Sequence, residues 1–167
     1  MARVCGVLVL CLLMVACGYQ WQGFDNPTVD SVLGDGSSTL KIDSVEQVSM
    51  YPWVPYYLRS VIRDEVNLRK LARWVDSGYA DYTMSVRMPS FLIRSYVSDA
   101  EDVTLLNAAT VQLEIVIAKG TTGEVVWRSG VISYSENYEN MQESVAIREV
   151  LIQAVNRGLE RMQQKGF

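Results

Sequence analysis

The sequence contains no histidine, and its three cysteines all lie within the first 17 of its 167 residues. Without histidine, the chain can form no catalytic triad with an imidazole base, no carboxylate–histidine metal site and no histidine-based pH switch. Since positions 18–167 contain no cysteine, neither a disulfide framework nor a thiolate metal site can form there. The composition therefore excludes catalysis and metal binding that depend on histidine, and catalysis that depends on a cysteine thiolate within residues 18–167.

The first 17 residues are typical of a bacterial lipoprotein signal. Arg3 precedes an apolar run over residues 4–16, which is shorter than the roughly 20 residues that span a bilayer as a helix and has the order of a secretory signal. The run ends in Leu13-Met14-Val15-Ala16-Cys17-Gly18, which resembles a lipobox. We therefore predict a signal peptide at residues 1–16 and a lipid anchor, with palmitate among its acyl chains, at Cys17. The alternative is a buried N-terminal helix whose cysteines act as small hydrophobic residues.

The predicted anchor also indicates where the protein resides. Acyl chains on Cys17, each contributing about 0.8 kcal/mol per buried methylene, would make membrane attachment effectively permanent. Gly18, rather than an aspartate, follows this cysteine, and by resemblance to the best-known sorting rule this favours the outer membrane, with the domain on the periplasmic face. Removal of residues 1–16 removes Arg3, so 14 basic and 19 acidic residues leave a net charge of 14 − 19 = −5. This acidic balance argues against a nucleic-acid partner.

Residues 17–38 are predicted to form the lipidated cysteine and a flexible tether. Glycine, asparagine, aspartate, proline and serine recur in this segment, which cannot bury enough apolar surface to offset its ordering entropy. Its large apolar residues are Tyr19, Trp21 and Phe24. They would either rest at the membrane interface, where aromatic side chains are favoured, or dock on the domain.

Residues 39–167 are predicted to form a single α+β domain. Period-two alternation indicates strands, and helical spacing of apolar side chains indicates helices. The expected strands are 39–44 with a continuation toward 48, 80–88 with an extension to 97, 103–118, and 124–134; the expected helices are 56–75 and 139–165. The order β-α-β-β-β-α favours a two-layer sandwich in which two helices cover one face of a four-stranded mixed sheet. Pro89 and Gly130 are expected at bulges or edge positions.

No segment has the pattern of a catalytic, metal-binding or phosphate-binding motif. Gly34-Asp35-Gly36 lacks the lysine of a phosphate loop, and the acid pair Asp64-Glu65 is adjacent in sequence, so its side chains diverge. The acidic turn at residues 99–102 lacks the calcium-loop pattern of EF-hands. We therefore predict a protein that is not an enzyme, with no catalytic residues, no metal ligands and no cofactor.

Three basic residues are candidates for binding an anionic ligand. Arg87 and Arg94 lie on the second predicted strand, and Lys119 lies at a hairpin tip. If the sheet has an open face, these cations could contact the phosphates of an anionic glycolipid while aliphatic neighbours receive its acyl surface. The simpler interpretation is that they are ordinary cations on the outside of strands.

The aromatic residues Tyr51, Trp53, Tyr56 and Tyr57 precede or begin the first predicted helix. Aromatic side chains with polar tips favour interfaces, but a loop that folds back over the helix start would bury them. We expect them to lie in the core.

Taken together, these features resemble the lipopolysaccharide-assembly lipoproteins of the LptE type. The resemblance rests on Cys17-Gly18-Tyr19 after the signal, the strand Ala80–Val86, the hairpin through Arg94-Ser95-Tyr96, and Gly123–Trp127 before the last strand. It implies an outer-membrane lipoprotein that plugs and helps assemble the LptD-type β-barrel and assists lipopolysaccharide delivery to the cell surface. It also implies lipopolysaccharide binding through basic residues, for which Arg87, Arg94 and Lys119 are the nearest by location.

The net negative charge of the mature chain favours the role of barrel partner over the binding of an anionic lipid. The alternative function is that of another exported α+β lipoprotein, acting as an activator of peptidoglycan synthesis or as a secretion accessory.

Overall fold

The computed structural model describes residues 31–98, 104–139 and 142–164, which form six strands and two helices. In chain order they are β1 (Thr39–Gln47), α2 (Val54–Leu68), β2 (Arg73–Trp74), β3 (Tyr82–Ser98), β4 (Thr104–Lys119), β5 (Val125–Arg128), β6 (Ile132–Glu139) and α3 (Glu143–Gln163). The strands form one sheet of order β2-β1-β3-β4-β5, with β6 also paired to β4. The predicted signal peptide, Cys17 and the three aromatic residues of the tether lie outside the described residues.

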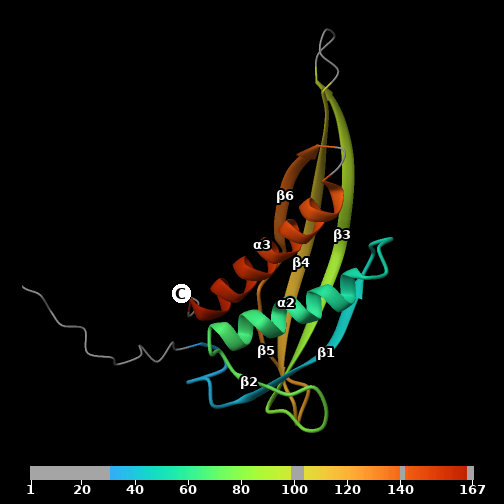
Figure 1. The fold of residues 1–167 in the computed structure, drawn as a ribbon. Helices are drawn as coiled ribbons and strands as arrows, with labels where there is room; N and C mark the ends of the chain where they lie inside the picture. Colours follow the sequence, from blue (N-terminus) through green and yellow to red (C-terminus); the bar gives the residue numbers. More distant parts are fainter. Residues whose placement is uncertain (1–30, 99–103, 140–141, 165–167) are drawn as a thin grey trace, which may run out of the picture.

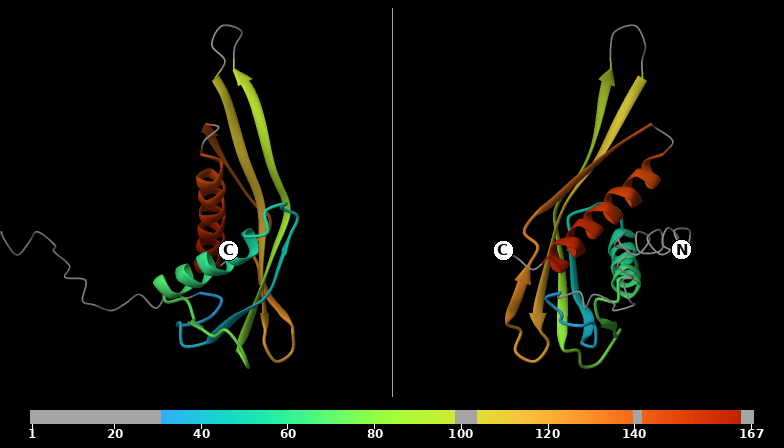
Figure 2. Two further views of the ribbon diagram at one scale, coloured as in Figure 1. Left: turned by 45° about the vertical axis from the view of Figure 1, so that its right-hand side comes forward. Right: turned by 90° about the vertical axis from the view of Figure 1, so that its left-hand side faces the viewer.

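The sheet is mixed, and both helices lie on one of its faces (Figures 1 and 2). β1 runs parallel to β2 and β3, whereas β3, β5 and β6 are antiparallel to β4. The predicted α+β class with two helices and a mixed sheet is therefore confirmed, but the sheet has six strands rather than four. Among the described residues, neither helix has the length and apolar composition needed to cross a membrane.

The first additional strand, β2, forms because helix α2 ends earlier than its apolar spacing predicts. The chain turns at Lys70, whose φ is 53°. The N–H of Leu71 donates to the carbonyl of Val66 (3.0 Å), and the N–H of Lys70 donates to Asn67 (3.2 Å). This is the Schellman pattern of helix termination. Leu71 and Ala72, which we expected on the helix, are instead buried just after it.

The other additional strand arises because the predicted strand over 124–134 is divided in two. At the division, Ser129 is buried and exchanges hydrogen bonds with Ile115 of β4: its N–H donates to the carbonyl oxygen, and its Oγ accepts from the N–H, both at 2.9 Å. Gly130 follows with a φ of 66°, a conformation that glycine adopts without steric cost. β5 and β6 thus pair in succession with the same edge of β4, and the bulge expected at Gly130 is a break between two strands.

β3 and β4 form a hairpin that pairs from Tyr82 and Lys119 to Ser98 and Thr104. The register shifts between Arg87 and Ser90, which confirms the irregularity predicted at Pro89. The hairpin continues beyond the end of β1, and its outer end also extends beyond the helices (Figure 2). The hairpin therefore exposes two surfaces, its open face and its outer edge.

The hydrophobic core lies between the helices and the sheet. The sheet contributes alternate residues, among them Val86 of β3 and Ile115 of β4, and the helices contribute Leu58 of α2 and Leu151 of α3, all fully buried. Leu33 is also fully buried and packs in this core. The folded domain thus includes part of the segment, residues 31–38, that the sequence assigned to the tether.

Candidate functional site

The face of the sheet that is turned away from the helices is mostly polar. Val111, Leu113 and Ile115 of β4 are buried against the helices, so the residues between them point to the other side. The strand registers place mainly polar residues on this open face: Thr83, Ser85 and Ser90 of β3, Thr110 and Gln112 of β4, and Ser133, Ser135 and Asn137 of β6. Leu92, which pairs with Thr110 and is 43% exposed, and Val116, which pairs with Ser85, are apolar residues on the same face. The hydroxyl oxygens of Thr110 and Ser135 lie 2.8 Å apart in a hydrogen bond across strands.

Arg87, one of the predicted ligand-binding residues, lies on this open face within a chain of alternating charges. Its Nε lies 3.2 Å from Glu46 Oε2 and its Nη1 4.0 Å from Glu114 Oε2. Arg128 Nη1 lies 3.9 Å from the other oxygen of Glu114. These exposed pairs contribute little to stability, but they compensate the positive charge of Arg87. An anionic ligand at this position would have to compete with two carboxylates.

Lys119, the second predicted residue, is also paired. Its Nζ donates to Glu124 Oε2 at 2.8 Å across the loop between β4 and β5. The hydrogen bond and charge of Glu124 raise the pKa of Lys119, and those of Lys119 lower the pKa of Glu124. Each partner therefore stabilises the charged form of the other.

Arg94 differs from both of these cations. It lies on the part of β3 that extends beyond β1, it is exposed, and no ion pair is formed by it within the described residues. At about 3.3 Å per strand residue, Arg94 is roughly 20 Å from Arg87 and roughly 40 Å from Lys119, which stands opposite Tyr82. The three predicted residues therefore do not converge on one site, and whether they bind a lipid stays a prediction.

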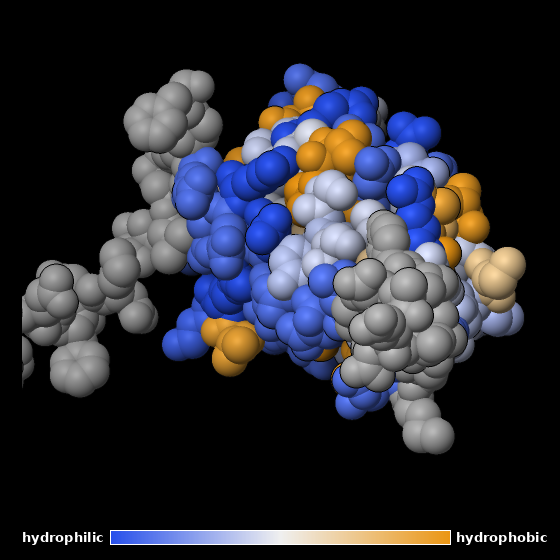
Figure 3. Space-filling view, turned by 90° about the horizontal axis from the view of Figure 1, so that it is seen from above, coloured by the Kyte–Doolittle hydropathy of each residue, from blue (hydrophilic) through white to orange (hydrophobic). Residues whose placement is uncertain are grey.

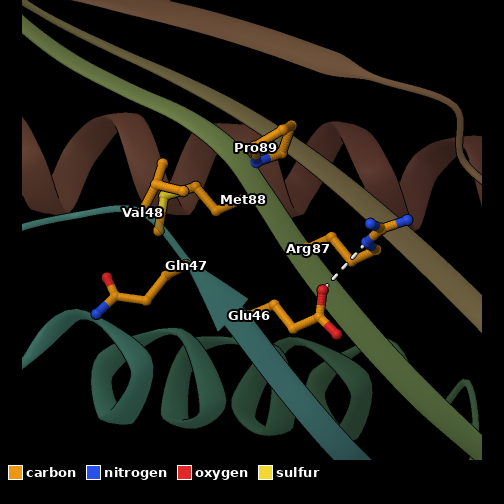
Figure 4. Close-up of a pocket in the computed structure, with 6 residues that line it drawn as sticks. All are labelled: Glu46, Gln47, Val48, Arg87, Met88 and Pro89. Carbon is orange, nitrogen blue, oxygen red and sulfur yellow. Dashed lines mark hydrogen bonds and ion pairs between the residues drawn. The ribbon is translucent and has the colours of Figure 1, made fainter.

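A groove lies along β3 where β1 leaves the sheet. It consists of two adjoining hollows that share Val48. The first has a volume of about 190 Å³ and is lined by Glu46, Gln47, Val48, Arg87, Met88 and Pro89 (Figure 4). The second has a volume of about 270 Å³ and is lined by Val48, Met50, Tyr51, Phe91, Leu92, Ile93 and Glu143. We call these two hollows together the β3-edge groove.

The wall of this groove is fixed by an aromatic cluster. The Tyr51 ring packs edge-on against Phe91, with centroids 5.7 Å apart, and its hydroxyl donates to Glu143 Oε1 at 2.5 Å. Burial, followed by the hydrogen bond and charge of Glu143, raises the pKa of Tyr51 to about 12. The hydroxyl thus stays protonated and acts as a donor throughout the physiological range.

The remaining aromatic residues mostly follow the expectation of burial. Trp53 and Tyr57 are half-buried against the core and pack edge-on at 5.7 Å, and the Arg148 guanidinium lies 5.3 Å and 5.1 Å from their ring centroids. Tyr56 is the exception, with 79% of its surface exposed. The cluster therefore connects the start of α2 to α3 rather than forming a separate aromatic surface.

The β3-edge groove itself was missed in the sequence, although a signal for it was present. The first predicted strand is much shorter than the second, so the second must continue without a partner on that side.

No group of three or more acidic side chains that could hold a metal ion occurs in the parts of the chain that the structure describes. What this arrangement offers is a set of recognition surfaces: a polar sheet face, a free strand edge and an adjacent groove.

Comparison with solved structures shows that this fold is shared. Protein XCC0632 from Xanthomonas campestris is 13% identical, with 76% of this chain and 85% of that chain covered at a TM-score of 0.56. A dodecamer of a PelC variant from Paraburkholderia phytofirmans is also 13% identical, with 76% and 89% covered at 0.55. Rare lipoprotein B from Shewanella oneidensis is 16% identical, with 73% and 92% covered at a lower TM-score of 0.44. No family model and no curated protein sequence matches the chain.

Proposed function

We propose that this protein is a non-enzymatic outer-membrane lipoprotein, anchored through Cys17, that plugs and helps assemble an LptD-type β-barrel and assists lipopolysaccharide delivery to the cell surface. The sequence resemblance suggests this role, and the observation that carries it structurally is the polar open face of the sheet. The lumen of an outer-membrane barrel is polar, so a protein seated inside it is expected to present mainly hydrogen-bonding side chains. Thr110, Gln112, Ser133 and Ser135 supply such a surface.

The first test is recovery of the barrel with the full-length lipoprotein from detergent-solubilised outer membrane. We expect one large β-barrel protein in near-equal amount. A photoreactive amino acid at Ser133, on the open face, should crosslink to that same protein. Recovery of the lipoprotein alone, or with proteins that are not barrels, would refute the proposal.

The second test concerns lipopolysaccharide. Arg94 is the predicted cation that has no carboxylate partner among the described residues, whereas Lys119 is paired with Glu124. Arg94→Asp should therefore weaken lipopolysaccharide binding, as measured by co-sedimentation, more than Lys119→Asp does. Equal binding by both variants and the unaltered chain would remove direct lipid contact from the proposal and leave the barrel role.

A second candidate is another exported lipoprotein of this fold, an activator of peptidoglycan synthesis or a secretion accessory. The likeness to PelC, which its structure describes as a dodecamer, favours a self-assembling version of this candidate. Depletion distinguishes the two: loss of surface lipopolysaccharide supports the barrel role, and altered cell-wall synthesis with normal lipopolysaccharide supports the alternative. The mass of the purified complex provides an independent check, because a homo-oligomer contains no barrel protein.

A further inference from the structure

We infer that the outer edge of β3 over residues 90–98, together with the β3-edge groove, binds an extended peptide segment of a partner protein, which adds to the sheet as a further strand. The expected segment has apolar side chains on one face and an acidic side chain on the other. This inference does not depend on the proposed function, because it rests on the backbone edge of β3 and on the β3-edge groove, and of the open face it requires only Arg94.

Among the described residues, no strand pairs with the outer edge of β3 over residues 90–98. β1 pairs with β3 from Leu40 and Tyr82 to Gln47 and Met88, where β1 ends. β3 continues to Ser98 and is paired there only with β4. The loop that follows β1 lies beside the start of the stretch (Figure 2). No further strand and no loop backbone hydrogen-bonds to this stretch within the described residues. Its outward N–H and C=O groups are therefore available to a new strand.

This edge lacks the protection that is usual for exposed strands. Proteins commonly blunt free edges with lysine, proline, bulges or short length. Here the proline and the bulge occur at Pro89, before the free stretch begins. The stretch itself reads Ser-Phe-Leu-Ile-Arg-Ser-Tyr-Val-Ser, which is rich in residues that favour strands. Such an edge would promote aggregation unless a partner covers it.

The β3-edge groove provides a place for apolar side chains. Phe91 pairs with Val111, so its side chain lies on the helix side of the sheet, beside Tyr51. Val48 and Met50 form the opposite wall and are 63% and 87% exposed. Figure 3, viewed from the end toward which the β3–β4 hairpin points, shows hydrophobic side chains reaching the surface among hydrophilic ones. A strand added to β3 would direct alternate side chains into this groove.

The open face of the same stretch carries a positive charge. Arg94 is exposed on the open face of the same stretch and has no ion-pair partner among the described residues, whereas Arg87, nearer β1, is compensated by Glu46 and Glu114. A residue opposite Arg94 on an added strand would lie within cross-strand contact distance. Charge complementarity therefore favours an acidic side chain at that position, and the mode of recognition is β-augmentation.

The test begins with ten-residue peptides selected from a display library on the full-length lipoprotein in detergent micelles. We expect the selected peptides to alternate apolar and polar residues and to include an acid. Binding of one labelled peptide, followed by anisotropy, should weaken roughly tenfold or more in Val48→Lys, because a charge replaces an apolar contact in the groove. Val131→Lys is the matched control, since Val131 is similarly exposed (57%) but lies between β5 and β6, and it should change affinity less than about twofold.

Two further measurements locate the peptide and identify its charge preference. Hydrogen exchange of the amides at residues 90–98 should slow on binding, and Arg94→Asp should reverse the preference from acidic to basic peptides. Absence of any selected peptide, equal binding by Val48→Lys, or protection elsewhere in the chain would overturn the inference. Protection of residues 90–98 without peptide, together with concentration-dependent dimerisation, would also overturn it by showing that a second copy of the chain occupies the edge.

Discussion

The close approach of helix α3 to the sheet gives a quantitative test of the packing. A Cβ placed on Gly158 would lie 2.6 Å from Ile115 Cδ1 and 3.2 Å from Ile132 Cδ1. Both isoleucines are almost fully buried, so neither can swing into solvent. In an open helix, Gly→Ala stabilises by about 1 kcal/mol, whereas overpacking a core costs about 1–3 kcal/mol. For Gly158→Ala we therefore expect a net loss of about 1 kcal/mol in the free energy of unfolding.

A double-mutant cycle separates this clash from other causes. Ile115→Val removes the methyl group that the new Cβ would meet, and by itself it should cost about 0.5–1.5 kcal/mol. In the double variant the added methyl occupies the vacated space, so the loss should be smaller than the sum of the two single losses by about 1 kcal/mol. Ile132→Val is the matched control. Its methyl group is farther away, so it should relieve the clash less.

Urea denaturation followed by tryptophan fluorescence measures these differences, with unchanged m-values showing that the unfolding transition is the same. Stabilisation by Gly158→Ala, or additivity of Gly158→Ala and Ile115→Val, would refute the reasoning. Either result would mean that α3 lies farther from β4 than the structure places it.

Three other predictions concern titration and processing. The backbone N–H and the hydroxyl of Thr39 donate to Asp81 at 2.8 and 2.7 Å and lower the pKa of Asp81 from 3.8. Asp81→Asn should therefore reduce the free energy of unfolding at neutral pH. The difference in free energy between the variant and the unaltered chain should shrink when denaturation is repeated below pH 3.8. Tyr51 has a pKa of about 12 in the folded protein against an ordinary 10.0, so the free energy of unfolding should fall as the pH rises through that range. Tyr51→Phe should remove a late component of the tyrosinate absorbance titration. An unchanged titration would contradict this assignment. Cys17→Ala should leave the precursor unprocessed or without lipid, as seen by mass spectrometry, and a shortened, membrane-anchored product would disprove the predicted lipobox.

The strands were predicted well because their alternation was strong. Residues 39–48, 80–97 and 103–118 were assigned to strands, and β1, β3 and β4 occupy almost the same ranges. The end of α2 was not predictable in the same way. Lys70 holds the positive φ that usually marks glycine or asparagine, and Leu71 and Ala72 continue the apolar spacing of the helix. Tertiary packing, rather than local sequence, sets that boundary.

The candidate site was predictable in its residue types but not in its charge balance. Arg87 and Arg94 were placed on the outside of one strand, and the structure agrees with that placement. Whether each cation is compensated depends on carboxylates from other segments, such as Glu46 of β1 against Arg87. The strand register decides these pairings, and period-two alternation alone does not supply it. This is why Arg94 could not be distinguished from Arg87 in the sequence.

The outer half of β3 makes the two proposals separable, because a strand presents its faces and its edge independently. Its side chains alternate between the helix side and the open face, while its outward backbone groups lie in the plane of the sheet. A barrel lumen that receives the open face would meet Ser133 and Thr110, whereas an added strand would meet Val48 and the backbone of residues 90–98. Val48→Lys should therefore weaken peptide binding without preventing recovery of a barrel through the open face. If it abolished both, the edge and the face would belong to one continuous interface, and the peptide segment would come from the barrel protein itself.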